Sequence, residues 1–134
     1  MSLRQFIYER ANSCCEYCQT SQLISGAQMH LEHIIPLAKG GKTIEANLCL
    51  ACAWCNSFKG TQIEFLDVQS NKITRLFNPR LDRWGGHFEW DESGCLIMGQ
   101  TPIGRVTVEA LQMNNQYIVP SRSLWVEAGW HPPT

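Results

Sequence analysis

The sequence has no excess of charge of either sign. Its 11 lysine and arginine residues are balanced by 12 aspartate and glutamate residues, and charged residues make up only 17% of the 134 residues. This balance excludes a strongly basic nucleic-acid coat, and it also excludes a highly charged disordered tail. Any contact with nucleic acid must therefore come from local groups of basic side chains.

Long hydrophobic runs are also absent. No stretch of about eighteen apolar residues occurs, and the start MSLRQFIYER lacks the apolar segment of a secretory signal. We therefore expect a soluble cytoplasmic protein that does not associate with a membrane. No repeat or linker divides the chain, and 44% of it is hydrophobic, so we predict a single domain over residues 1–134.

Cysteine, in contrast, is abundant, with seven residues in the chain. Two C-x-x-C pairs, Cys15 with Cys18 and Cys52 with Cys55, flank a segment of 33 residues. In a reducing compartment such pairs hold metal more often than they form disulfides, and two of them supply the four thiolates of a tetrahedral zinc site. The sequence therefore predicts a structural Zn²⁺ at these four residues.

Three further cysteines complicate this assignment. Cys49 lies three residues before Cys52, so Cys49-x-x-Cys52 is a C-x-x-C pair in its own right. We favour the interpretation that Cys14, Cys49 and Cys95 are small buried apolar residues.

The segment between the cysteine pairs has the signals of two strands and a helix. Pro36 and the Gly40-Gly41 pair predict a turn, and Gly60 ends a helical stretch. The sequence predicts a helix over about residues 2–12, then strands at 29–35 and 47–52, and a helix at 53–59. After residue 61 it predicts a strand at 72–77, a hairpin within 87–98, a helix from Thr101 to about Asn114, and a last helix at 120–128.

Glu32, His33, Asn47 and Asn56 form the most informative group of polar residues. A zinc site at the ends of this segment would bring Asn56 back toward the strand that carries Glu32 and His33. Carboxylate and amide oxygens are hard ligands that suit Mg²⁺ or Mn²⁺. An imidazole with an ordinary pKa near 6.5 accepts a proton from water at neutral pH. An alternative role for Asn56 is that of a helix N-cap.

The stretches EHIIPLAKGG and ANLCLACAWCNSFKG resemble the HNH endonuclease family, in its zinc-bound subgroup with paired C-x-x-C motifs. The resemblance covers residues 15–60, and the later stretches LFNPRLDRWGGHFEW and GWHPP are similar to the tail of small stand-alone bacterial HNH proteins. It implies an α+β fold with a ββα-metal core stapled by a four-cysteine zinc site. A C-terminal β-hairpin and helices, within residues 61–134, would pack on that core.

The resemblance also implies a role for each matching residue. His33 would be the general base, Glu32 and Asn56 would hold one catalytic Mg²⁺ or Mn²⁺, and Asn47 would brace the loop that carries the base. Two departures stand out: Glu replaces the commoner Asp at position 32, and Asn replaces His at the third letter of the motif. Each replacement keeps an oxygen ligand. The implied substrate is DNA, and the implied products carry 5′-phosphate and 3′-hydroxyl ends.

Basic residues beside these positions are candidates for phosphate contacts. Lys39, Lys42 and Lys59 flank the expected phosphate position, and contact from at least one of them would make binding salt-dependent, although such lysines are most often solvated surface charges. A group of arginines near Pro79 and Trp84 either contacts nucleic acid or covers the core. The role of His30, which would share a strand face with Glu32, stays open.

In a second interpretation the protein keeps the motif but does not catalyse a reaction. It is then an inactive zinc-stapled module that binds nucleic acid or protein. The near-neutral charge favours this alternative. The sequence leaves open the oligomeric state and the form of the substrate, which includes duplex, nicked, branched or single-stranded DNA and RNA. The biological role, among restriction, phage packaging, mobile elements and repair, is equally open.

Overall fold

The computed structural model describes residues 1–133 as a mixture of helices and small antiparallel sheets, which confirms the predicted α+β class. The first half contains α1 (Leu3–Arg10), α2 (Gln22–Ser25), β1 (His30–His33), β2 (Leu48–Ala51) and α3 (Ala53–Lys59). The second half contains β3 (Glu64–Asp67), β4 (Lys72–Arg75), β5 (Phe88–Trp90), β6 (Ile97–Gly99), α4 (Pro102–Ala110) and α5 (Ile118–Glu127). Short 3-10 turns lie at Leu37–Lys39, Glu45–Asn47 and Trp84–Gly86.

Helix α1, within the helix predicted over about residues 2–12, begins with a capping box. The Ser2 hydroxyl accepts a hydrogen bond from the Gln5 amide, and the Gln5 side chain accepts one from the Ser2 amide. Ile7 is fully buried. Arg10 donates to the carbonyl oxygens of Glu45 and Leu48, at 3.0 and 2.6 Å, and so joins the helix to the start of β2.

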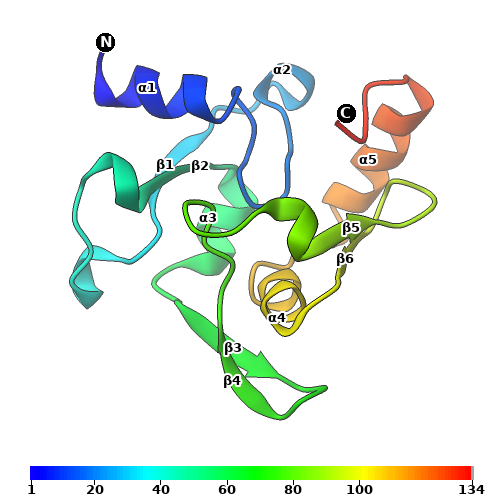
Figure 1. Ribbon diagram of the computed structural model, residues 1–134. Coiled ribbons are helices and arrows are strands. Elements are labelled where there is room, and N and C mark those ends of the chain that lie inside the picture. Colours follow the sequence, from blue (N-terminus) through cyan, green and yellow to red (C-terminus); the bar gives the residue numbers. More distant parts are fainter. Residues whose placement is uncertain (134) are drawn as a thin grey trace.

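The strand, turn, strand, helix order expected for residues 29–59 is present. Strands β1 and β2 pair antiparallel, with Glu32 opposite Cys49 and His33 opposite Leu48. All four residues of β2 are buried, so this strand is the centre of the core. Helix α3 begins directly after its N-cap Cys52, ends at Gly60 and packs against β1. This ββα unit is the part of the fold that positions the candidate site (Figure 1).

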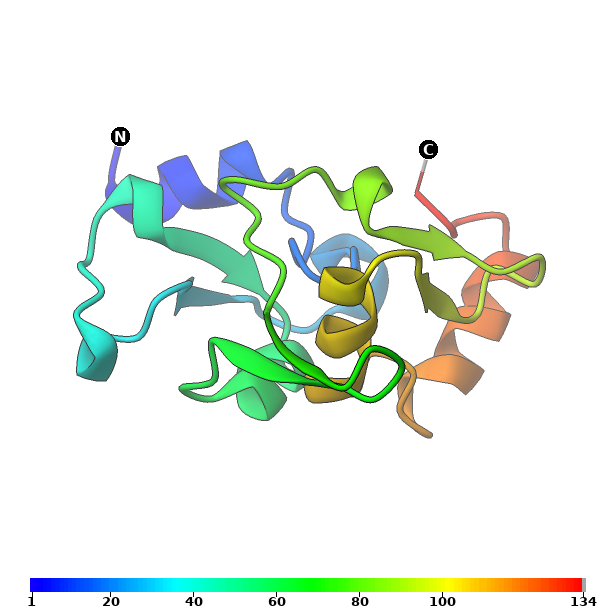
Figure 2. The same ribbon diagram turned by 60° about the horizontal axis from the view of Figure 1, so that its bottom comes forward.

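The second half packs around α4, which contacts β3, β4 and β6. Strand β4 and the β5–β6 hairpin were predicted, whereas β3 was missed because its four residues, EFLD, include two acidic ones and show little strand character. Gly104 within α4 is required by close packing, since a Cβ at this position would overlap the carbonyl oxygen of His87. In the view of Figure 2, α4 lies between the β1–β2 sheet and α5.

Two helices differ slightly from the prediction. Helix α4 ends at Ala110, before the expected Asn114, and α5 begins at Ile118, two residues before the expected start. Asn114 instead bonds the backbone of Ile97 in both directions, at 2.8 and 2.9 Å, and this anchors the chain between the helices to β6. None of the helices within residues 1–133 has the length and apolar character needed to cross a lipid bilayer.

Candidate functional site

The two predicted C-x-x-C pairs meet in the fold. The sulfur atoms of Cys15, Cys18, Cys52 and Cys55 all lie within 4.8 Å of one another, and all four residues are buried. Each pair closes a tight turn in which a backbone amide faces a thiol: the Cys18 amide lies 3.5 Å from Cys15 Sγ, and the Cys55 amide lies 3.4 Å from Cys52 Sγ. Four buried sulfur donors at this spacing are compatible with a structural zinc ion.

The structure also decides which C-x-x-C pair contributes to the cluster. Cys49 lies outside it, because its thiol is directed toward Glu32 Oε2, at 3.8 Å. Burial raises the pKa of the Cys49 thiol far above its ordinary value, so this group stays neutral. The expectation of burial is correct for Cys49, whereas Cys14 and Cys95 are partly exposed.

His33 lies at the end of β1 and is partly exposed. A hydrogen bond of 2.9 Å joins its Nε2 atom to the hydroxyl of Thr43. Within residues 1–133, the other ring nitrogen, Nδ1, has no hydrogen-bond partner. Sequence reasoning missed Thr43; the available signal was a hydroxyl residue two positions after the Gly40-Gly41 turn.

Asn47 connects the loop after His33 to the strand that follows it. Its Oδ1 atom accepts from the Ile35 amide, and its Nδ2 atom donates to the carbonyl oxygens of Ile35 and Lys42, each bond being 2.9 Å. Gly41 lies against the same group, and a Cβ there would overlap the Ile35 carbonyl oxygen. These contacts hold the loop that links His33 to Thr43 in one conformation.

Glu32 points inward and is only 5% exposed. Its Oε1 atom accepts from the Lys59 ammonium at 2.9 Å, and its Oε2 atom accepts from the Tyr17 hydroxyl at 3.1 Å. Burial raises the pKa of Glu32, and the nearby Lys59 and Tyr17 oppose this shift. The carboxylate is therefore part of a buried polar network.

Lys59, which was expected near a phosphate, is the cation of this network. It is 1% exposed, and its ammonium also donates to the carbonyl oxygens of His33 and Ile34, at 3.2 and 3.0 Å. The three donors of the ammonium are thus used by Glu32 and by the backbone that carries His33. In this position Lys59 is not accessible to a phosphate.

An open pocket of about 300 Å³ brings three of the predicted residues together. Glu32, His33 and Asn56 all line it, and Gly60 and Thr61 close one side. Asn56 lies in the second turn of α3, whose N-cap is Cys52, so the alternative that Asn56 caps this helix is wrong. Its side-chain amide makes no hydrogen bond within the described residues and is available to a ligand.

The remaining basic candidates fall into two groups. Lys39 and Lys42 are exposed, and Lys39 donates to the Thr61 carbonyl oxygen at 2.7 Å, at the edge of the pocket. The arginines of the tail are partly neutralised, since Arg75 forms an ion pair with Asp82 and Arg80 forms one with Glu16. His30 is exposed at the start of β1 and does not line the pocket.

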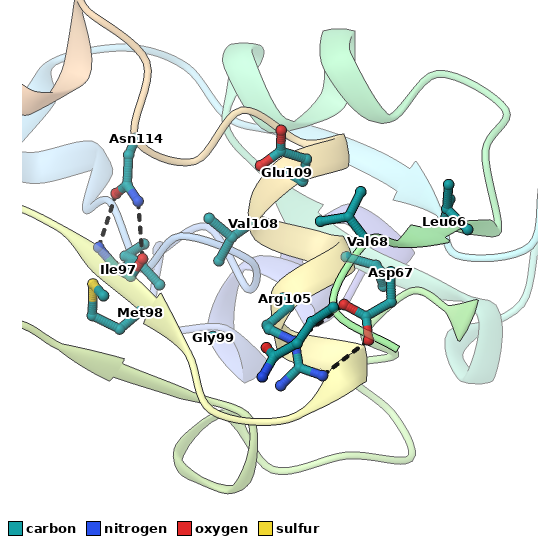
Figure 3. A pocket seen from close by; sticks show the side chains of 12 residues that line it. Leu66, Asp67, Val68, Ile97, Met98, Gly99, Arg105, Val108, Glu109 and Asn114 are labelled. Atoms are coloured by element: carbon teal, nitrogen blue, oxygen red, sulfur yellow. Dashed lines mark hydrogen bonds and ion pairs between the residues drawn. The ribbon is translucent and has the colours of Figure 1, made fainter. Parts of the chain in front are cut away.

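A larger cavity of about 400 Å³ lies between β3, β6 and α4 (Figure 3). Two of its three charged side chains neutralise each other, because Arg105 binds the Asp67 carboxylate with two hydrogen bonds of 2.9 and 3.1 Å, and the third is Glu109. Most of the other lining residues are apolar, and none of them is a predicted site residue. The larger cavity is therefore not the candidate functional site. The predicted site residues line the smaller pocket beside His33.

Comparison with known families agrees with this location. Residues 15–62 match the family model described as HNH endonuclease. The match begins at the first cysteine of the cluster and ends just after α3. No curated protein and no solved structure matches the chain.

Proposed function

We propose that the HNH domain formed by residues 15–62 makes this protein a metal-dependent endonuclease that hydrolyses phosphodiester bonds in DNA. The observation that carries the proposal is the pocket in which Glu32, His33 and Asn56 meet. These residues combine a proton acceptor with two oxygen ligands, and metal-assisted phosphodiester hydrolysis requires both functions. The four-cysteine cluster would hold a structural Zn²⁺ behind this pocket, since Cys52 and Cys55 also begin the helix that carries Asn56.

The donors of the pocket fit a hard divalent cation such as Mg²⁺ or Mn²⁺. The Asn56 amide oxygen is unpartnered within the described residues, and Glu32 Oε1 accepts only the bond from Lys59. Because a carboxylate oxygen has two acceptor positions, Oε1 keeps one for a metal. Glu32 and Asn56 would therefore hold the ion, which when bound would stabilise the negative charge that develops on the phosphate oxygens.

His33 would act as the general base. If its Nε2–H donates to the Thr43 hydroxyl, the lone pair of the neutral ring lies on Nδ1, which is free to accept a proton from the attacking water. Thr43 would then select the tautomer and fix the ring plane. Asn47 would hold the loop that supplies Thr43, and Lys59 would fix the backbone of His33 through its bond to the carbonyl oxygen.

DNA would approach along the exposed side of the loop that follows β1. Lys39 and Lys42 are exposed there, and the net charge of −1 means that such local cations must supply the attraction for phosphate. Binding that depends on few phosphate contacts should weaken with salt less steeply than binding by a strongly basic protein.

One observation favours the alternative of a catalytically inactive zinc-stapled binding module. The Lys59 ammonium, 2.9 Å from Glu32, repels a second cation at the same carboxylate. If this repulsion wins, the pocket would hold no metal, and the motif would serve folding and binding alone. Glu32 would then be a structural residue.

Nicking of supercoiled plasmid DNA separates the two functions. Purified protein with bound zinc quantified should nick DNA in Mg²⁺ or Mn²⁺ and should not do so in EDTA, while circular dichroism shows the fold intact. The absence of cleavage of duplex, nicked, branched and single-stranded DNA and of RNA with either ion would contradict the nuclease. Retained gel-shift binding in the same samples would then support the module.

The Thr43→Val variant tests the proposed tautomer. Removal of the hydroxyl leaves the His33 ring without its hydrogen-bond partner. The cleavage rate should therefore fall by about 10- to 100-fold, which is a part of the rate enhancement that general-base catalysis supplies. Thr43→Ser keeps the hydroxyl and should stay within a few-fold of the wild-type rate. Equal rates for the Val and Ser variants would show that Thr43 does not orient the base.

A further inference from the structure

Arg122, on α5, is a fully buried cation that has no carboxylate partner within residues 1–133. It is 0% exposed, and its guanidinium donates to the carbonyl oxygens of Cys95 and Met113 and to Asn114 Oδ1, at 2.9, 2.7 and 3.1 Å. These acceptors are all neutral. Within residues 1–133 it forms no ion pair with a carboxylate, and its Nε atom is buried without any hydrogen-bond partner. A buried charge in this state is costly unless an anionic group faces it.

The cysteine cluster is the group that faces Arg122. Arg122 lines one small cavity, of about 10 Å³, together with Cys18, Cys52 and Cys55. That volume is about enough for a single water molecule. Within residues 1–133 the buried Nε atom of Arg122 has no other hydrogen-bond partner, so the cavity it shares with these sulfur atoms is the place where its unused donor can be satisfied. On another side, the guanidinium carbon lies 5.1 Å from the centre of the Trp90 ring.

We propose that Arg122 is the counter-charge of the four-cysteine metal centre and that its Nε–H is directed at the thiolates. The inference rests on the structural zinc of the proposed function. Four thiolates and one Zn²⁺ carry two more negative charges than positive ones, so a buried guanidinium beside them removes half of the excess. The same contact explains why Arg122 has no carboxylate partner within residues 1–133, and why its Nε atom has no hydrogen-bond partner there.

This arrangement gives the segment after residue 62 a role that the HNH match does not cover. Arg122 lies on α5, outside the matched region. It would act on the metal centre as an outer partner that tunes the metal ligands. Metal retention and the packing of α5 would then depend on each other. Loss of Arg122 would weaken the hold on zinc without removing any ligand.

The test compares zinc release from wild type, Arg122→Met and Arg122→Lys into a chromogenic chelator, after zinc content is measured by mass spectrometry. The Met variant should release zinc about 10- to 100-fold faster than wild type, as is typical when an outer partner of a metal site is removed. The Lys variant, which keeps the charge but lacks Nε–H, should fall between them. Arg105→Met is the matched control, because Arg105 binds Asp67 away from the cysteines, and it should release zinc at the wild-type rate.

Cobalt substitution supplies a second readout that does not depend on the rate of release. A hydrogen bond stabilises a thiolate, so its loss should shift the sulfur-to-Co²⁺ charge-transfer band to longer wavelength in the Lys and Met variants and not in Arg105→Met. If the Met variant does not fold, the Lys variant decides the matter with the same two measurements. Unchanged release and an unchanged band would overturn the inference, whereas wild type that binds no zinc at all would overturn the proposed zinc instead.

Discussion

Replacement of His33 with alanine is expected to reduce the rate of DNA cleavage by about 10²- to 10⁴-fold, the usual contribution of a general base. The ring is partly exposed, and its one hydrogen bond is to the Thr43 hydroxyl. Its loss would therefore remove the proposed proton acceptor and little packing. The zinc content and the thermal unfolding temperature should stay close to those of wild type. Plasmid nicking under single-turnover conditions, with zinc quantified in the same preparation, measures both expectations.

His30→Ala is the matched control for this experiment. His30 lies on the same strand, but it is exposed and does not line the pocket that His33 shares with Glu32 and Asn56. Its replacement should leave the rate unchanged within a few-fold. If His33→Ala cleaved as fast as wild type, the assigned base would be wrong, and a loss shared equally by both variants would point to a general effect on DNA binding.

Replacement of Lys59 with methionine is expected to lower the free energy of unfolding by about 3–5 kcal/mol, because it leaves a buried carboxylate without its cation. Glu32 is 5% exposed and retains only the Tyr17 hydroxyl and the Cys49 thiol as donors. The backbone carbonyl oxygens of His33 and Ile34 lose their donor as well. Equilibrium unfolding in urea measures this change, and for a marginally stable domain it is a large fraction of the total.

The double variant Lys59→Met with Glu32→Gln distinguishes loss of the ion pair from loss of packing. The glutamine side chain carries no charge and still accepts a hydrogen bond from the Tyr17 hydroxyl, so this variant should recover much of the stability lost in Lys59→Met. Cleavage activity should not return with it, since the proposed carboxylate ligand is gone. A double variant no more stable than Lys59→Met alone would show that the carbonyl contacts of Lys59, and not its charge, dominate.

Local sequence signals are present at α1 and at most of the elements that build the ββα unit. Ser2 and Gln5 form a capping box within four residues, Gly60 ends α3, and each C-x-x-C pair closes its own turn. Such signals need no distant partner. Spacing alone does not choose between Cys49 and Cys55 as the partner of Cys52, because each lies three residues from it, and the cluster in the structure contains Cys55. The HNH match covers the same residues.

The surroundings of these residues were decided by the tertiary structure. Lys59 has the sequence context of a surface lysine at the end of a helix, yet it is buried against Glu32, 27 positions earlier in the chain. Thr43, which bonds His33, lies ten positions after it in the chain, and Arg122 lines a cavity with cysteines that lie about 70 to 100 positions before it. β3 forms with few strand signals of its own, because β4 and α4 supply its partners.

The sequence by itself therefore determined the candidate residues: the four cysteines by their C-x-x-C spacing, and His33, Glu32, Asn47 and Asn56 by the stretches that resemble the HNH family. Only the tertiary structure decided what faces them. A buried charge has lost its contact with water, so the free energy of burying it depends on its nearest charged or polar partner. That partner can be distant in sequence. For Glu32 that partner is Lys59, which the packing of α3 supplies, and for Arg122 the packing of α5 supplies the proposed one; no local pattern in the sequence encodes either.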